Sequence, residues 1–345
     1  GELGLPAEEQ TIAKLLKDAG YRTAITGKWH LGYEPKFAPH LQGFDYTFYC
    51  IGGGMDYFHY LDNLAGYNLF QDGNPIAREG YFTDLATDEA IGFIEREKGR
   101  PFFLYLPYTT PHAPFQGPDD GLPNPLPLAS KLWRQGSAPP KTYIAMIESL
   151  DLAVGRVLDK LESEGLAENT VVIFASDNGG TGSARNTPLR GIKGGTFEGG
   201  IRVPGIVRWP GVVPAGVASD QPSATFDWTA SIARIAGVTA APEKPFEGMD
   251  IIRHVAEGAS DVARTLYWRK PRGTSLWRGV REGRLKYVSE ANGNDVAEYL
   301  FDVVADISER ADLKAERPEE LQRLRALYDT WEARVRRDRR GRPED

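Results

Sequence analysis

The stretch that decides the fold is residues 143–180, which read YIAMIESLDLAVGRVLDKLESEGLAENTVVIFASDNGG. Apolar residues recur at helical spacing from Tyr143 to Leu161, which predicts one long amphipathic helix closed by Gly165. Residues 170–176 then predict a central strand, because their apolar side chains stand in series. A helix followed by a strand that ends in a polar, glycine-containing loop is typical of an α/β protein.

The same alternation continues on both sides of this stretch. Helical spacing recurs over residues 7–19, from Thr83 or Asp84 to residue 98, and over residues 228–236. Strand-like segments lie at residues 22–26, 102–108 and 201–209. The segment at 102–108 is apolar almost throughout, which indicates a strand buried on both faces, whereas Pro204 places the last segment at a sheet edge or a bulge.

Beyond about residue 260 the pattern changes to separate short strands. They are expected at residues 265–269, 276–280, 285–289 and 299–303, and a helix over residues 321–335 would cover them. We therefore predict an α/β fold with a mostly parallel sheet between helices over residues 1–258. A C-terminal subdomain over residues 259–345 would add a small antiparallel sheet plus a helix.

Composition limits the classes of function. The chain has 345 residues, 41% of them hydrophobic and 26% charged, which excludes a disordered or coiled-coil protein. Its net charge of −7 argues against a nucleic-acid or anionic-membrane partner, since both favour a basic surface. No apolar stretch is long enough to span a bilayer. The single cysteine, Cys50, excludes an internal disulfide framework and is the only candidate thiol nucleophile.

Reactive residue types follow three of the predicted strands. Lys28 and His30 follow the first strand, His112 follows the strand at 102–108, and Asp177 and Asn178 follow the strand at 170–176. In open α/β sheets, ligands bind beyond the carboxyl ends of the strands. If these three strands are parallel neighbours, the three loops meet in one cleft.

Asp177 and Asn178 offer a carboxylate and an amide oxygen, which suit Ca²⁺ or Mg²⁺ better than a soft metal. Two ligands are too few, because Ca²⁺ takes about six to eight oxygens. Asp-Asn-Gly is also a common turn sequence, so a plain turn is the alternative interpretation.

The lysines and histidines of these loops suit an anionic substrate. Lys28 can bind an anionic oxygen as a point charge, while His30 and His112 can transfer a proton near neutral pH. A second lysine, Lys193, lies in a glycine-rich segment that lacks the context of a phosphate-binding P-loop. The alternatives are a surface lysine beside a locally bonded histidine, a structural His112, and a solvated loop around Lys193.

Together these segments resemble the type I sulfatases of the alkaline-phosphatase-like superfamily. The similar segments are GYRT at 20–23 with GKWHLG at 27–32, PFFLYLPYTTPHAP at 101–114, SDNG at 176–179, KGGTFEGGIRVP at 193–204, and YLFD at 299–302. Each is weak alone, but they occur in the family's order along essentially the whole chain.

The resemblance implies a role for each candidate residue. Lys28 and Lys193 would hold sulfate oxygens, His30 would assist turnover of the nucleophile, and His112 would protonate the leaving alcohol. Asp177 and Asn178 would bind Ca²⁺, with Mg²⁺ as the alternative. The substrate would be a sulfate ester of a glycan or a small aryl compound, and the location would be periplasmic, extracellular or lysosomal.

The family's nucleophile motif is absent from the printed sequence. Type I sulfatases use a formylglycine made in a Cys/Ser-x-Pro/Ala-x-Arg motif, and an Asp-Asp pair on the first strand completes their metal site. Cys50 has neither the proline nor the arginine, so we interpret it as a packed residue. We expect both elements upstream of Gly1, and we expect the chain as printed to be inactive.

Two other functions remain open at this point. A phosphodiesterase or phosphonate hydrolase of the same superfamily would share the fold and the metal ligands, although the pair of lysines resembles the sulfatases. A sulfoglycan-binding protein without catalysis would keep the pocket and lack the nucleophile.

Overall fold

The computed structural model describes residues 4–340, with side chains up to Arg336, and divides into two compact units. Unit 1 comprises the residues up to Ile173 together with Val207–Val217 and Thr225–Gly258. Unit 2 comprises Phe174–Ile206, Ala218–Ala224 and the residues from Ala259 onward. Among residues 4–340, no helix has both the length and the apolar character needed to cross a bilayer.

Unit 1 is built on a five-stranded mixed sheet in the order β4-β3-β2-β1-β5. Its strands are β1 (Arg22–Lys28), β2 (Tyr46–Cys50), β3 (Phe70–Gln71), β4 (Asn74–Pro75) and β5 (Phe102–Tyr105). β1 pairs in parallel with β2 and with β5, while β2–β3 and β3–β4 are antiparallel. The parallel strands therefore have their carboxyl ends at one edge, where Lys28 and Cys50 are paired in register.

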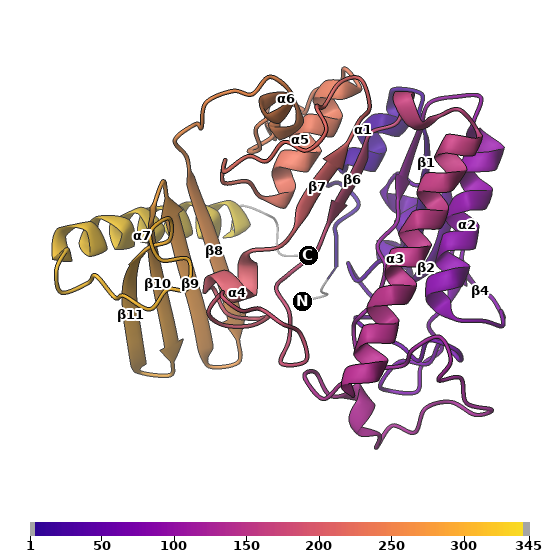
Figure 1. Ribbon diagram of the computed structural model, residues 1–345, viewed down its shortest axis with the longest axis horizontal. Coiled ribbons are helices and arrows are strands. Elements are labelled where there is room, and N and C mark those ends of the chain that lie inside the picture. Colours follow the sequence, from indigo (N-terminus) through magenta and orange to yellow (C-terminus); the bar gives the residue numbers. More distant parts are fainter. Residues whose placement is uncertain (1–3, 341–345) are drawn as a thin grey trace. The chain divides into compact units, whose positions relative to one another are not determined.

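The helices of unit 1 pack on this sheet directly or through a neighbouring helix (Figure 1). They are α1 (Ile12–Asp18), α2 (Phe82–Glu97), α3 (Pro140–Ser163), α5 (Thr225–Ile235) and α6 (Ile251–Ala256). Short 3₁₀ turns lie at Pro35–Phe37, Pro39–Gln42, Lys131–Trp133 and Ala167–Asn169. The side chains of Met146, Ser149 and Ala153 are the buried ones in the middle of α3. Their helical spacing gives α3 the buried stripe that packs beside α2.

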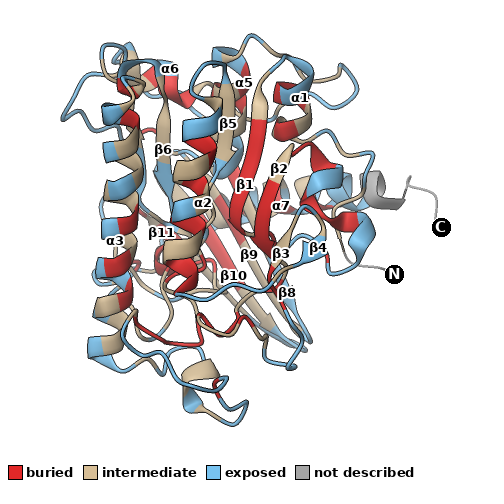
Figure 2. Cartoon of the chain, turned by 90° about the vertical axis from the view of Figure 1, so that its right-hand side faces the viewer, coloured by how far each residue is buried: buried red, intermediate tan, exposed pale blue. Residues whose placement is uncertain are grey.

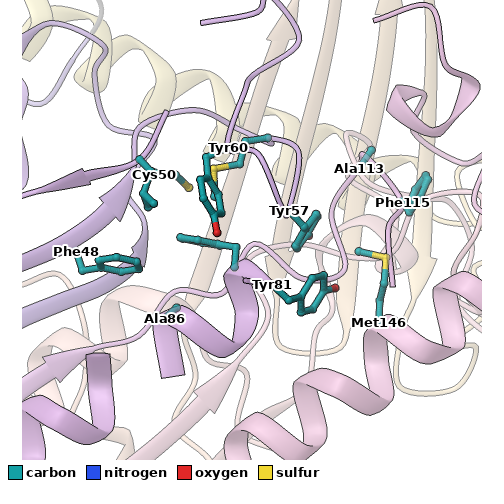
Figure 3. Packing of buried hydrophobic residues seen from close by; sticks show 12 residues of the cluster. Phe48, Cys50, Tyr57, Tyr60, Tyr81, Ala86, Ala113, Phe115 and Met146 are labelled. Atoms are coloured by element: carbon teal, nitrogen blue, oxygen red, sulfur yellow. The ribbon is translucent and has the colours of Figure 1, made fainter. Parts of the chain in front are cut away.

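Alternation along β2 divides the core of unit 1 into two clusters. Phe48 and Cys50 belong to the cluster that includes Phe82 of α2, whereas Tyr49 belongs to the cluster that includes Ala13 of α1. This follows from the period of two in a strand, which sends successive side chains to opposite faces. Figure 2 shows β1 and β2 buried along most of their length, and Figure 3 shows the packing around Cys50.

Unit 2 contains a four-stranded antiparallel sheet in the order β11-β10-β9-β8. Its strands are β8 (Thr265–Arg272), β9 (Ser275–Glu282), β10 (Leu285–Asn292) and β11 (Asp295–Asp302), followed by α7 (Pro318–Arg340). Each hairpin turn carries a glycine at positive φ, namely Gly273, Gly283 and Gly293, which is the conformation that tight two-residue turns require.

Both faces of this sheet are covered. Val280, Tyr287 and Leu300 pack against Leu324 and Tyr328 of α7. Val288 and Phe301 point to the other face, where Phe197 of the glycine-rich segment packs on them. Phe197 directly precedes the short helix α4 (Glu198–Ile201).

The predicted α/β fold, with a helix-flanked sheet and a small antiparallel sheet plus helix, is confirmed. The sheet of unit 1 was expected to be mostly parallel and is mixed, since β2–β3 and β3–β4 are antiparallel. Two strands also differ from expectation. Residues 170–176 do not form a central strand. Within residues 4–340, β6 (Val172–Ala175) pairs only with β7 (Gly205–Arg208), and the two form a separate two-stranded sheet. The side chain of Phe174 in β6 is 36% exposed. β5 ends at Tyr105 and is an edge strand. Its first three residues are half-buried and Tyr105 is exposed, so the strand is not buried on both faces. An apolar run does not distinguish an edge strand from a central one.

Candidate functional site

Lys28 is held at the carboxyl end of β1 by a close backbone approach. Its N–H donates to the carbonyl of Pro107 at 2.7 Å. Gly27 precedes it with φ +141°, and a Cβ there would lie 2.2 Å from the same carbonyl oxygen. Only glycine fits this position, because both the dihedral angle and the contact exclude a side chain. The half-buried Lys28 side chain is thereby fixed at the edge of the sheet.

His30 is exposed because its neighbour anchors the loop. The indole of Trp29 is buried, and its Nε1–H donates to the carbonyl of Phe37 at 2.8 Å. His30 has φ +48°, and its N–H donates to the carbonyl of Ile51 at 3.0 Å. In the sequence Lys-Trp-His, buried Trp29 therefore anchors the loop, while Lys28 and His30 on either side of it are partly or fully exposed.

His112 has a defined tautomer. Its Nδ1 lies 2.6 Å from the carbonyl oxygen of Ala113, which can only accept, so Nδ1 carries the proton of the neutral ring. Nε2 is then the acceptor and lies 3.0 Å from the amide nitrogen of Gln135. The main chain is held as well, since the hydroxyl of Tyr57 donates to the carbonyl of His112 at 3.1 Å.

Two consecutive glycines bring the histidines together. A Cβ on Gly53 would lie 2.9 Å from Cε1 of His30, and a Cβ on Gly54 would lie 2.8 Å from Nδ1 of His112. The segment 50–54 also begins at Cys50, the register partner of Lys28. Unit 1 therefore brings Lys28, His30 and His112 together around this one segment.

Cys50 is a core residue. It is fully buried in the cluster of Figure 3. Burial raises the pKa of its thiol to about 12, although the positive charge of Lys28 acts in the opposite direction. The group therefore stays a thiol at neutral pH and is a poor nucleophile, in agreement with its interpretation as a packed residue.

Asp177 and Asn178 lie in unit 2, in the loop that follows β6. Asp177 is exposed and Asn178 is half-buried. The Nδ2 of Asn178 donates to the carbonyl of Gly179 at 3.1 Å, which leaves the amide oxygen as the accepting end. Gly179 in turn donates its N–H to the carbonyl of Gly200 at 3.0 Å, and a Cβ there would lie 1.9 Å from the carbonyl oxygen of Gly199. This loop is therefore packed directly on the glycine-rich segment.

Lys193 belongs to the same group of residues. Its N–H donates to the carbonyl of Gly180 at 3.0 Å. Asn186 closes the turn, since its amide nitrogen donates to Gly180 at 3.0 Å and to Gly191 at 3.2 Å. Unit 2 therefore brings Asp177, Asn178 and Lys193 together, while Lys28, His30 and His112 lie in unit 1.

The donor set of unit 2 fits a hard cation in kind but not in number. Asp177 and Asn178 present the carboxylate and amide oxygens that Ca²⁺ and Mg²⁺ favour. No cluster of three or more His, Cys, Asp or Glu residues suited to a metal occurs within the part of the chain that the structure describes. These two residues would supply only part of a coordination shell.

Several contacts of the site were not predicted from the sequence. They are the contact of Gln135 with His112, the bond of Asn186 to Gly180 and the fit of Gly54 against His112. The run Gly52-Gly53-Gly54 is a sequence signal that could have indicated the last of these, because consecutive glycines allow a close backbone approach. His254, in α6 of unit 1, is also buried and is 7% exposed.

A partly parallel sheet flanked by helices, a small antiparallel sheet and polar loops at the strand ends define an α/β protein of the alkaline-phosphatase-like fold. The sulfatase family model matches residues 3–238. The chain therefore belongs to the sulfatase family.

Named relatives agree with this assignment. The chain is 32% identical to dog (Canis lupus familiaris) N-acetylgalactosamine-6-sulfatase over 288 residues, covering 77% of this chain and 52% of the relative. It is 31% identical to an arylsulfatase of Hemicentrotus pulcherrimus, covering 77% of this chain and 49% of the relative. The chain thus spans about half the length of the curated relatives it matches. Among solved structures, Ps i-CgsB in complex with k-i-k-neocarrahexaose is similar at a TM-score of 0.83 and 29% identity, covering 96% of this chain and 76% of that one.

Proposed function

We propose that the full-length protein hydrolyses a sulfate monoester of a glycan. The observation that carries the proposal is the grouping of Lys28, His30 and His112 around residues 50–54, together with Lys193 beside Asp177 and Asn178 in unit 2. The names of the relatives support it, since one is an N-acetylgalactosamine-6-sulfatase and a similar solved structure holds a neocarrahexaose.

The two lysines act on the sulfate group. Transfer of a sulfuryl group leaves negative charge on its oxygens, and cations fixed beside those oxygens stabilise the transition state. Lys28 is fixed by its backbone at the end of β1, and Lys193 by its bond to Gly180. We assign both ammonium groups to the sulfate oxygens.

His112 is the general acid in this proposal. Its Nδ1–H is engaged by the carbonyl of Ala113, so the proton given to the leaving oxygen comes from Nε2 of the imidazolium. Loss of that proton leaves the neutral ring with its remaining proton on Nδ1, which is the tautomer that the bond to Ala113 stabilises. His30 assists turnover of the nucleophile, which we propose is a formylglycine of the full-length protein.

We propose that Asp177 and Asn178 supply two of the oxygen ligands of a Ca²⁺ ion, with Mg²⁺ as the alternative. A bound Ca²⁺ adds positive charge at the sulfate group. The support is the chemistry of the two donors and the rigid packing of their loop on Gly199 and Gly200.

We further propose that the protein acts in the periplasm, the extracellular space or a lysosome. The support is its membership of the sulfatase family, whose type I members mostly act in such compartments. Fractionation of cells that express the complete gene would test this: enzyme recovered in the cytoplasmic fraction alone contradicts it.

A panel of defined sulfated saccharides tests the proposed function. The full-length protein is incubated with each saccharide and Ca²⁺, and released inorganic sulfate is measured by ion chromatography. We expect release from at least one saccharide, and loss of that release in Lys193→Ala but not in Lys270→Ala, an exposed lysine of β8. Tight binding of a saccharide without release would indicate a glycan-binding protein, and turnover of phosphate or phosphonate esters alone would indicate the other hydrolase class.

A further inference from the structure

The glycine-rich segment that carries Lys193 rests on the C-terminal sheet of its own unit. Phe197 packs on Val288 and Phe301, on the sheet face opposite α7. The ring of Trp277 in β9 lies 3.4 Å from where a Cβ on Gly195 would stand. The sheet is thus covered on one face by a helix and on the other by this segment.

Three buried charged residues join the segment to the sheet. The ammonium of Lys286, in β10, lies 2.6 Å from Oε1 of Glu198 and 2.9 Å from Oε1 of Glu309. The exposed fractions of the three side chains are 0%, 3% and 0%. The other carboxylate oxygen of Glu309 accepts the backbone N–H of Glu198 at 2.7 Å. The group therefore fixes both the side chain and the backbone of Glu198.

Arg190 ties the other end of the segment to the same residue. Its Nη1 donates to the carbonyl of Glu309 at 3.0 Å, and its guanidinium lies 4.0 Å from the ring centroid of Phe197. The N–H of Gly199 donates to the carbonyl of Arg190 at 2.7 Å, which closes the base of the loop. Lys193 therefore lies within a loop whose two ends are both held by Glu309.

Stability alone does not explain this arrangement. Apolar residues of similar volume usually stabilise a core as well as buried ion pairs do, because burying charges carries a large desolvation penalty. Glu309 also adopts φ +52°, a region that is unfavourable for residues other than glycine. Such backbone strain persists only where the surrounding structure enforces one geometry. The geometry enforced here is that of residues 190–201.

We propose that Lys286, Glu198 and Glu309 are positioning residues that hold Lys193 in place for binding an anionic sulfate group. The role of Lys193 in this statement rests on the proposed function. The C-terminal sheet is then a platform for part of the substrate site. A purely structural role is the competing explanation.

Hydrogen exchange measured by mass spectrometry tests the holding step without any need for activity. Lys286→Met keeps the volume and removes the charge that joins the two carboxylates. The matched control is Glu332→Gln, on the α7 face of the same sheet, where Glu332 accepts from Nε of Arg269 at 2.7 Å. We expect peptides covering residues 190–201 to exchange at least tenfold faster in Lys286→Met and at the wild-type rate in the control. Wild-type exchange in Lys286→Met overturns the proposal.

Kinetics on the full-length protein test the consequence for Lys193. We expect Lys286→Met to lower kcat/KM at least tenfold and to weaken inhibition by inorganic sulfate at least fivefold. Glu332→Gln should stay within twofold of wild type in both. Equal losses in the two variants would show a structural role only and overturn the proposal.

A second variant covers the case in which Lys286→Met does not fold. Glu309→Gln preserves the shape of the side chain and removes one charge. We expect the same faster exchange of residues 190–201 and the same kinetic losses in this variant, and wild-type exchange would overturn the proposal. If the wild-type protein releases no sulfate, the proposed function fails, whereas the exchange experiment still decides whether the three residues hold the segment.

Discussion

His112 illustrates how one contact defines the chemistry of a side chain. The carbonyl of Ala113 selects the Nδ1–H tautomer and leaves Nε2 as the reactive nitrogen. Sequence reasoning identified His112 as a candidate acid because of its residue type and its place after a strand. It could not identify the partners of the ring, because Gln135 is 23 residues away and lies in a loop. Residue identity was therefore predictable, whereas orientation was not.

The leaving group determines how strongly His112 is needed. We expect His112→Ala to lower kcat/KM by about 10²–10⁴-fold on a sulfated sugar, the usual contribution of a general acid. The loss should be at least tenfold smaller on 4-nitrophenyl sulfate, whose leaving group is stable without a proton. Steady-state kinetics on both substrates measure this, with His40→Ala as a control at an exposed histidine. Equal losses on the two substrates would contradict the assignment.

Cys50 should resist alkylation in the folded protein. Burial raises the pKa of its thiol to about 12, so almost no thiolate exists at pH 8. We expect no labelling of the Cys50 peptide by iodoacetamide at pH 8, and complete labelling after unfolding in guanidinium. Peptide mass spectrometry reports the extent of labelling. Rapid labelling of the native protein would show that the cluster of Figure 3 is open.

Asp45 links stability to acid pH. Burial raises the pKa of its carboxyl group, but bonds from Lys17 and from the N–H of Thr23, with the charges of Lys17 and Arg22, outweigh burial and lower it. Because the pKa is lower in the folded state, ionised Asp45 stabilises the folded protein at pH values above its ordinary pKa of about 3.9. This stabilisation is lost as the pH falls below that value and the carboxylate is protonated. We expect Asp45→Asn to lower the urea midpoint at pH 7, with the difference shrinking from pH 5 toward pH 2. A difference independent of pH would contradict this.

At the scale of elements, periodic segments were predicted well and isolated strands less well. The long helix at 143–161 and the four C-terminal strands have unambiguous periods and are found as α3 and β8–β11. β5 and β6 have apolar sequences, but their residues are half-buried or exposed. Their burial depends on which strands lie beside them, which the local pattern does not state. Ile201 was expected in a strand and instead ends α4, because the segment turns on Gly199 and Gly200.

Two glycines should respond in opposite directions to the same substitution. Gly54→Ala would place a Cβ 2.2 Å from the carbonyl oxygen of Ala113, so we expect a lower thermal unfolding midpoint. Gly155→Ala, in the middle of α3 with no atom within 4 Å, should stabilise the protein by about 0.5–1 kcal/mol. Thermal unfolding of the two variants measures both. Destabilisation by Gly155→Ala, or none by Gly54→Ala, would contradict the backbone fit.

At the scale of the whole molecule, the order of weak motifs predicted the family where no single motif did. Lys28, His112, Asp177 and Lys193 lie far apart in the sequence, and only the shared direction of parallel strands suggested that such loops meet. That reasoning holds for the loops after β1 and β5, which are parallel neighbours. It does not extend to the loop after β6, which lies in a separate two-stranded sheet. The proposed role of the C-terminal sheet as a support for Lys193 depends on contacts between residues far apart in the sequence. Lys286 and Glu198, for example, are 88 residues apart. No local sequence pattern reveals such contacts.

The most direct test of sulfate ester hydrolysis compares two esters of one phenol. The kcat/KM of the full-length protein is measured with Ca²⁺ present for 4-nitrophenyl sulfate and for 4-nitrophenyl phosphate. We predict that the sulfate ester is the better substrate by at least a hundredfold, and that Lys193→Ala removes most of that preference. Preferential hydrolysis of the phosphate ester, or no hydrolysis of the sulfate ester, would contradict the proposed function.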